Sequence, residues 1–345
     1  MQITIAPRTK ALFWRISQTV PVLFGVVVIS FVLTRALPGD PAAYFAGAAA
    51  DPQSIEEIRV ALGLDKSLLQ QFLIYLSDLF QGDLGQSLST GQPVAHDLAS
   101  RLPASLELTL IALFFSCAIA IPLGILAATR PGSAIDHLCR VLVTAGVSLP
   151  TFFTGIVLIY VFYYLLGIAP SPLGRLDFIY IAPEHITGFY LIDALIAGDA
   201  NTWFGALKQL VLPATTLALF TLAPIARMTR AAMLSALSSD YIRTARAAGL
   251  LQRKVLFTYA FRNALLPLVT TLGMVFSFTL GANVLVEKVF AWPGIGSYAV
   301  EALVVSDYAA VQGFVLAMAV LFVLLNLVID LTYAAIDPRI GFEAQ

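Results

Sequence analysis

The sequence has few charged residues, and this scarcity sets its class. Only 12% of the 345 residues are charged and 59% are apolar, whereas soluble domains are about half apolar and about a quarter charged. That balance excludes an ordinary water-soluble fold and favours a chain that lies in lipid. The net charge of −1 gives no indication of a nucleic-acid partner.

Cysteine and histidine are also rare, which restricts metal and redox chemistry. Two cysteines, Cys117 and Cys139, cannot build a disulfide framework or a four-ligand zinc site, so we expect both to be packing residues. The three histidines fall between predicted membrane spans and on different sides of the membrane: His96, His137 and His185. We therefore expect no metal site.

Two sequence patterns that would support an enzyme are missing. No GxxxxGK[ST] motif occurs, and the dipeptide Gly-Lys is absent altogether, so the chain has no P-loop for ATP. No catalytic triad or pair of carboxylates is recognisable at a fixed spacing. We expect neither a catalytic residue nor a bound cofactor in this chain.

Six stretches are apolar and long enough to cross a membrane, since a helix needs about 20 apolar residues to span the bilayer core. They cover residues 14–36, 105–128, 138–167, 209–227, 264–286 and 309–336. The predicted fold is therefore all-α, a polytopic membrane protein with six transmembrane helices. Prolines in or near these spans are expected to kink the helices without breaking them: Pro21, Pro122, Pro150, Pro213, Pro224 and Pro267.

The distribution of Lys and Arg predicts the orientation, because cytoplasmic loops carry the excess of these residues. The N-terminal segment 1–13 is basic, the loop 37–104 is acidic, and residues 227–262 hold seven Lys or Arg against the single acid Asp240. We expect both termini in the cytoplasm and the loop 37–104 outside. A cleaved signal peptide is the weaker alternative, because its removal would leave an odd number of spans.

The outer loop 37–104 is predicted to be a small, partly helical domain. Apolar residues recur at helical spacing over Ser54–Leu64 and Leu68–Phe80. We expect two short amphipathic helices that pack on the outer ends of the spans, and direct contact with cargo is the less favoured alternative.

Another short helix is predicted in the basic loop 228–263. Residues Asp240–Gly249 are compatible with a helix that a side chain at 238–240 caps and that Gly249 ends in a left-handed turn. Its alanines and arginines suit insertion into a groove of a soluble partner. A loop that merely sets the membrane topology fits the composition equally well, and the residues alone leave both interpretations open.

The stretch Tyr241–Gly249, with Phe261–Pro267 after it, resembles the coupling-loop (EAA) motif of the dipeptide and oligopeptide permease family of ABC importers. In that family the loop docks onto the ATPase subunit. Arg243 stands where the general importer motif has a leading Glu, as is usual in the peptide branch. The resemblance implies that these residues couple the chain to the ATPase: Tyr241, Arg243, Thr244, Ala245, Arg246, Ala247, Gly249, Arg262, Asn263 and Pro267.

Other stretches resemble the same family along nearly the whole chain. They are Leu37–Pro41, Gly63–Asp65, Gly82–Ser87, Arg101–Glu107, Thr187–Asp193, Phe290–Gly296 and Asp337–Arg339. The resemblance implies a type I importer permease fold, with a transmembrane domain over 105–340 and a tail at 341–345. It also implies an outer gate, although for Trp292 an anchoring role at the membrane interface is an equal alternative. The gate residues are Glu287, Phe290, Trp292, Pro293, Gly294 and Gly296.

The resemblance further implies a function and a set of partners. The chain would be a non-enzymatic permease subunit, closest to the first permease of the dipeptide type, that imports dipeptides or short oligopeptides across a bacterial inner membrane. It would lie in membrane lipid beside a second homologous permease, two subunits that bind ATP and Mg, and a solute-binding protein that is periplasmic or lipid-anchored. The same scaffold also carries nickel, opines and glycosides. An ion-coupled carrier with Asp330 as a relay is the alternative from another class.

Overall fold

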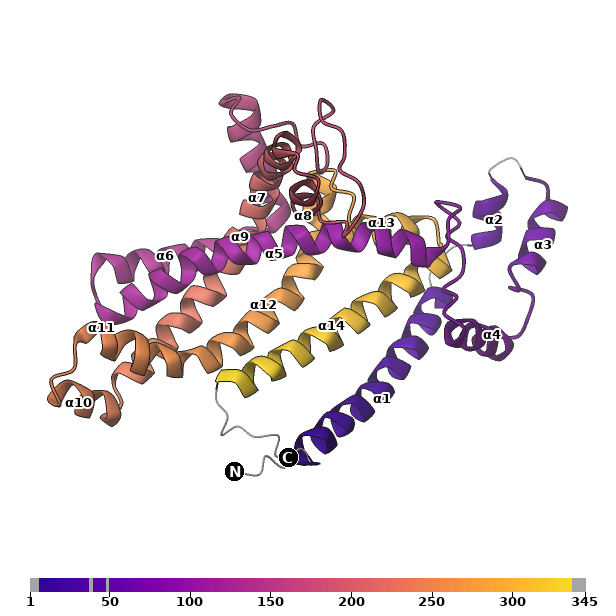
Figure 1. Cartoon of the computed structure of the whole chain (residues 1–345). Coiled ribbons are helices and arrows are strands. Elements are labelled where there is room, and N and C mark those ends of the chain that lie inside the picture. The colour runs from indigo at the N-terminus through magenta and orange to yellow at the C-terminus, as the bar shows by residue number, and fades with distance from the viewer. Residues whose placement is uncertain (1–5, 37–39, 48–49, 337–345) are drawn as a thin grey trace. The chain divides into compact units, whose positions relative to one another are not determined.

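A computed structural model describes residues 6–36, 40–47 and 50–336, which are mainly helical (Figure 1). Within these ranges the only β-type pairing is an isolated bridge between Gln86 and Pro93, so the predicted all-α class is confirmed. The chain divides into two compact units. Unit 1 takes the described residues up to Pro103 together with Gly294–Leu324, and unit 2 takes Ala104–Pro293 with the described residues from Leu325.

Unit 1 combines short helices with one long helix and parts of two others. Its elements are α1 (Ala6–Ala36), α2 (Pro41–Ala46), α3 (Pro52–Ala61), α4 (Leu68–Phe80), the start of α5 (Val94–Thr129), α13 (Ile295–Val304) and the start of α14 (Tyr308–Ile336). The Asp51 side chain caps α3, and Ser67 forms a capping box with Gln70 at the start of α4. The two short helices predicted in the loop 37–104 are therefore confirmed, and their position outside the membrane stays a prediction.

Helix α4 has two apolar faces, and one of them packs on a span. The rings of Phe72 and Tyr75 pack on Phe31 of α1, with ring centroids 5.0 and 6.1 Å apart. On the other side of α4, Leu69 is 68% exposed and Phe80 is 88% exposed. The predicted packing of this helix on a span is therefore confirmed, and α4 also carries a second apolar face that unit 1 leaves uncovered.

The core of unit 1 joins two segments that are far apart in the sequence. Val94 packs with Tyr298 of α13 in one buried cluster. A Cβ atom at Gly313 of α14 would lie 2.4 Å from the Val94 Cγ1 atom, so α14 approaches α5 this closely only because residue 313 is glycine. The Ser87 hydroxyl donates to the Asp307 carboxylate at 2.7 Å. These contacts attach residues 87–98 to residues 298–313.

Unit 2 is built around one long helix, α9 (Ala200–Leu237), which is buried along much of its length. This helix packs against α6, α7, α8 and α12. The other elements are α6 (Ala134–Ser148), α7 (Thr151–Leu158), η1 (Ile159–Leu165), α8 (Tyr190–Ile196), α10 (Asp240–Ala247), α11 (Gln252–Lys254), η2 (Val255–Phe261) and α12 (Arg262–Val289). The ends of α5 and α14 complete the unit.

Five helices in the described ranges are long and apolar enough to cross a membrane. The spans are Thr19–Ala36, Val94–Thr129, Ala200–Leu237, Gln252–Val289 and Tyr308–Tyr333. They correspond to five of the six predicted spans. Pro213, Pro224 and Pro267 lie inside unbroken helices, as expected.

The third predicted span, 138–167, is not a continuous helix. The chain leaves the helical conformation at Leu149, whose ψ is 133°, and Pro150 then precedes α7. A residue before proline is disfavoured in the α region, so the expected kink at Pro150 is a break. The apolar segment that follows, Thr151–Leu165, is shorter than the other five spans.

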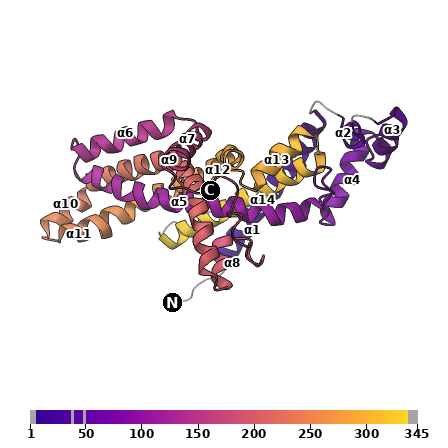
Figure 2. The ribbon, with the colours of Figure 1, turned by 90° about the horizontal axis from the view of Figure 1, so that it is seen from above.

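The length of α9 separates the two regions that bear on function. A helix of 38 residues is about 57 Å long. Helix α8 precedes its start and α10 follows its end, so these two helices lie at opposite ends of unit 2, as both views show (Figures 1 and 2).

Candidate functional site

The predicted coupling helix forms as α10, at one end of unit 2. It begins after Ser239, which has extended backbone, and it includes residues Asp240–Ala247. Gly249 follows with a φ of +71°. Side chains other than glycine rarely adopt this left-handed conformation, so the predicted left-handed end of the helix is confirmed.

One face of α10 is packed into the unit. Ile242 is fully buried and Ala245 is 7% exposed. Both join a buried cluster that includes Met233 near the end of α9 and Val255 of η2. The cluster attaches α10 to the end of α9 before it and to η2 after it.

The other face of α10 is open. The exposed predicted coupling residues are Tyr241, Arg243, Thr244, Arg246, Ala247 and Gly249, and Arg262, Asn263 and Pro267 of α12 are exposed too. Arg243 lies 3.4 Å from Asp240, but both side chains are at least 80% exposed, so this ion pair adds little stability. Ala245 differs from the rest, because it lies on the packed face and is unavailable to a partner.

A buried carboxylate holds the same end of unit 2 together. Asp136, at the start of α6, has no exposed side-chain surface and accepts two hydrogen bonds from Arg230 of α9, at 2.5 and 3.0 Å. Arg140 and the Gly132 N–H group donate to it at 2.8 and 2.9 Å. The sequence analysis missed this contact, although Asp136 is the only acid in residues 130–140 and lies four residues before Arg140, which was a signal for part of it.

Replacing Asp136 with Asn is expected to lower the unfolding temperature at neutral pH. Hydrogen bonds from Arg230, Gly132 and Arg140 hold the pKa of Asp136 well below its usual range. Its stabilising contribution is therefore fully present above the unfolded carboxyl pKa of about 3.9 and is lost as the pH falls below that value toward the folded pKa.

Thermal unfolding of the purified wild type and Asp136→Asn from pH 7 downwards measures this effect. The difference between their midpoints should stay constant to about pH 5 and narrow only in stronger acid. Asp240→Asn is the matched control, because the Asp240 side chain is 92% exposed, and it should change the midpoint little. Equal midpoints for wild type and Asp136→Asn at pH 7 would contradict the stabilising role.

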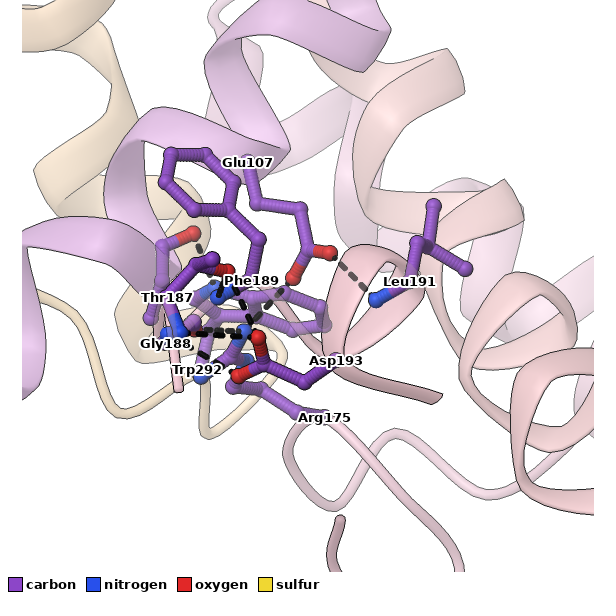
Figure 3. Close-up of polar contacts among 9 residues, drawn as sticks. Glu107, Arg175, Thr187, Gly188, Phe189, Leu191, Asp193 and Trp292 are labelled. Carbon is purple, nitrogen blue, oxygen red and sulfur yellow. Dashed lines mark hydrogen bonds and ion pairs between the residues drawn. The ribbon is translucent and has the colours of Figure 1, made fainter. Parts of the chain in front are cut away.

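A second buried ion pair lies at the α8 end of unit 2 (Figure 3). The Arg175 Nη2 atom donates to Glu107 Oε2 at 2.6 Å and to the Gly188 carbonyl at 2.8 Å. The Leu191 N–H group donates to the other carboxylate oxygen at 2.8 Å, and the guanidinium lies 3.6 Å from the ring centroid of Tyr190. The loop before α8 is therefore fixed to α5. The signal in the sequence was a lone arginine in an otherwise acidic segment.

The loop between these contacts is closed by Asp193 (Figure 3). Its carboxylate accepts hydrogen bonds from the Thr187 N–H group and hydroxyl, at 2.8 and 2.6 Å, and from the Gly188 N–H group at 2.9 Å. Burial alone would raise the pKa of Asp193, but these hydrogen bonds outweigh it and lower the pKa. Residues 187–193, which carry one of the family-like motifs, thus form a rigid turn.

Four of the predicted gate residues lie in unit 2. Phe290 and Trp292 are buried in its core, and the Trp292 Nε1 atom donates to the Ala104 carbonyl at 3.0 Å. Glu287 is fully buried and accepts hydrogen bonds from Ser105 and Asn283. Pro293 is exposed.

These positions bear on the two interpretations of Trp292. A side chain in the core of unit 2 does not lie at a lipid interface, so the interface-anchor interpretation is wrong. Gly294 and Gly296 begin α13 in unit 1, so the motif connects the two units. Its role as a gate stays a prediction.

The described residues offer no cluster of three His, Cys, Asp or Glu side chains for a metal ion. Residues 120–342 match the family described as "Binding-protein-dependent transport system inner membrane component", and residues 9–109 match the N-terminal family of such membrane components. The chain belongs to this family. It is therefore a multi-pass permease subunit of a binding-protein-dependent ABC transport system, and it works with the other components of such a system.

Curated relatives of this permease match along almost its whole length. The probable D,D-dipeptide permease protein DdpB of Escherichia coli K12 is 47% identical and covers 95% of this chain and 98% of its own. The di/tripeptide permease protein DppB of Pseudomonas aeruginosa is 43% identical, with 95% and 98% covered. The dipeptide permease protein DppB of E. coli K12 is 39% identical, with 94% and 97% covered. Among solved structures, the inward-facing MetNI methionine transporter matches with a TM-score of 0.48 and 18% identity, over 68% of this chain and 93% of that chain.

Proposed function

We propose that this permease forms half of the translocation path of an ABC importer for dipeptides and short peptides. The observation that carries the proposal is its identity of 39 to 47% with permeases named for dipeptides, D,D-dipeptides and di- or tripeptides, over nearly the full length of each chain. No feature of the described structure favours nickel, an opine or a glycoside instead.

In the assembled transporter, a second homologous permease completes the path and two ATPase subunits bind ATP and Mg. A solute-binding protein, free or lipid-anchored, delivers the peptide from outside. The Lys and Arg excess of 227–262 supports a cytoplasmic position for α10 and for both termini. The open face of α10 is the contact with one ATPase, and the gate residues Glu287–Pro293 lie at the opposite end of unit 2.

The packing of α10 suits the transmission of movement. Ile242 and Ala245 attach α10 to α9 and η2, and Asp136 attaches the end of α9 to α6 through Arg230. Close-packed side chains transmit a displacement because they have little room to absorb it. When the ATPases close on ATP, α10 and the inner ends of α6, α9 and α12 therefore move as one body.

The test is uptake of labelled dialanine by proteoliposomes that contain the complete transporter. We expect uptake that requires ATP inside, is blocked by excess unlabelled L,L- and D,D-dipeptides, and is unchanged by excess nickel ion. Two results would reject peptide cargo. One is equal uptake of labelled free alanine in place of labelled dialanine. The other is uptake that excess nickel ion blocks and that excess dipeptides do not block.

The same system separates an ATP-driven importer from an ion-coupled carrier. Collapse of the proton gradient with an uncoupler should leave ATP-driven uptake unchanged, and so should Asp330→Asn in α14. Loss of uptake in both measurements would favour the carrier, since an acid within a span is the usual position of a proton relay.

A further inference from the structure

Unit 1 contains a pocket of about 320 Å³ that the transport mechanism above does not use. The pocket lies between the end of α1, helix α4, residues 83–88 and the start of α14. Two cations, Arg35 and Lys66, line it together with the carboxylates of Asp78, Asp83 and Asp307. A cavity with charges of both signs suits a ligand that itself carries both.

The pocket lies at the level where two membrane spans end. Arg35 is in the last turn of α1, whose span is Thr19–Ala36, and Tyr308 begins the span of α14. Both residues line the pocket. Side chains at the end of a span lie among the lipid headgroups, so the pocket opens at headgroup depth.

The Arg35 side chain is held in place, and some of its N–H groups remain free to donate to a ligand. Its Nε atom donates to Gln71 at 3.3 Å and its Nη1 atom to Thr34 at 3.1 Å, and the guanidinium lies 3.8 Å from the ring centroid of Phe31. In the described part of the chain no carboxylate forms an ion pair with it, and no residue there accepts from its Nη2 atom. A fixed guanidinium with free N–H groups is a binding site for phosphate oxygens.

The carboxylates of the pocket differ in how far the protein satisfies them. Asp307 accepts hydrogen bonds from Ser87, Ser89 and the Ala310 N–H group. Asp83 accepts one, from the Gly85 N–H group at 2.8 Å. Asp78 lies on α4, and no described residue pairs with its side chain in an ion pair. Asp78 and Asp83 therefore offer negative charge to a ligand ammonium group.

Apolar surface leads away from the pocket on two helices. Ile29, Val32 and Leu33 of α1 are more than half exposed, and so are Leu69 and Leu73 of α4. Such residues lie against acyl chains when they are in a bilayer. The features on unit 1 thus match one molecule with an anionic group, an ammonium group and apolar tails.

We propose that this pocket is a specific site for a zwitterionic phospholipid with a primary ammonium group, phosphatidylethanolamine. Its phosphate binds Arg35 and Lys66, its ammonium group binds Asp78 and Asp83, and its acyl chains follow the exposed faces of α1 and α4. Phosphatidylglycerol lacks the cation and faces the carboxylates with negative charge only. The choline headgroup has no N–H group to donate.

Native mass spectrometry of the detergent-purified transporter measures lipid retention directly. With equal amounts of phosphatidylethanolamine, phosphatidylglycerol and phosphatidylcholine added, we expect phosphatidylethanolamine to be retained about tenfold better than either, because each charge-assisted hydrogen bond contributes roughly a factor of ten. Lys66→Gln should reduce its retention about tenfold, and Asp78→Asn with Asp83→Asn should raise that of phosphatidylglycerol. Arg130→Gln, an exposed site in unit 2, is the control that should change nothing.

Lys66 and Asp83 are exposed, so these variants are expected to fold, and the unfolding midpoint of each checks this. Equal retention of the three lipids, or a preference that survives Lys66→Gln and the double variant, would overturn the proposal. Soluble dialanine is the competing zwitterion. If it displaces the lipid and its binding depends on Lys66 and Asp78 in the same way, the pocket takes peptide and the lipid assignment is wrong.

Discussion

Reversing the charge of Arg246, by Arg246→Glu, is expected to abolish ATP-driven peptide uptake while the permease still folds. Arg246 lies on the exposed face of α10, and in the described part of the chain it has no ion-pair partner whose loss would destabilise unit 2. In a contact with the ATPase, the reversed charge would oppose a surface complementary to arginine. Such a mismatch costs several kcal/mol, which corresponds to a loss of association of roughly a hundredfold or more.

Two measurements distinguish lost coupling from lost folding. Co-purification of the ATPase subunits reports the contact, and peptide uptake by proteoliposomes reports its consequence. Arg130→Glu is the matched control, because it reverses an exposed charge in the turn between α5 and α6, outside the coupling motif. Ala245→Asp would not serve, since that residue is 7% exposed and the substitution would place a charge in the packed base of α10. Normal uptake and normal ATPase binding by Arg246→Glu would remove Arg246 from the contact.

Arg175→Met is expected to destabilise unit 2 by roughly 3–5 kcal/mol, the usual cost of removing one partner of a buried ion pair. Both side chains are buried, with 6% of Arg175 and 3% of Glu107 exposed. The variant leaves the Glu107 carboxylate with the Leu191 N–H group as its remaining donor in Figure 3. Methionine fills most of the space of the arginine stem, so the effect comes from the uncompensated charge.

Chemical unfolding of the purified protein measures this cost, and a double-mutant cycle isolates the pair. Glu107→Gln with Arg175→Met removes both charges and should recover much of the lost stability. Lys208→Met is the control, because Lys208 lies near the start of α9, at the α8 end of unit 2. It removes a cation that has no buried partner among the described residues. If the double variant is no more stable than Arg175→Met, the energy does not come from the pairing of these two charges.

The sequence was sufficient to predict features that depend on neighbouring residues. The coupling helix formed between Ser239 and Gly249, because the start of a helix and a left-handed residue at its end are local properties. The two outer helices and five of the six spans followed from apolar spacing in the same way.

Features that depend on distant residues were not predictable from the pattern. Glu107 and Arg175 are 68 positions apart, so the lone arginine in its acidic segment marked Arg175 as unusual but did not indicate which residue it contacts. The burial of Ala245 and Trp292 has the same cause, since it depends on which elements cover them. The break at Pro150 was a different kind of error, because proline is tolerated within other helices of this chain and its effect depends on the neighbouring helices.

Unit 1 is built from two segments that are far apart in the sequence, and this has a consequence for the synthesis and folding of the permease. Its early helices complete their core only with residues 294–324, which the ribosome adds about 200 residues later. At synthesis rates of about 5–20 residues per second, the first spans wait roughly 10–40 s for their partners. During that interval Val94 and Ser87 lack the Tyr298 and Asp307 contacts of the finished protein. The newly synthesised N-terminal segment therefore depends on the insertion machinery and on the surrounding lipid until the last span has been synthesised.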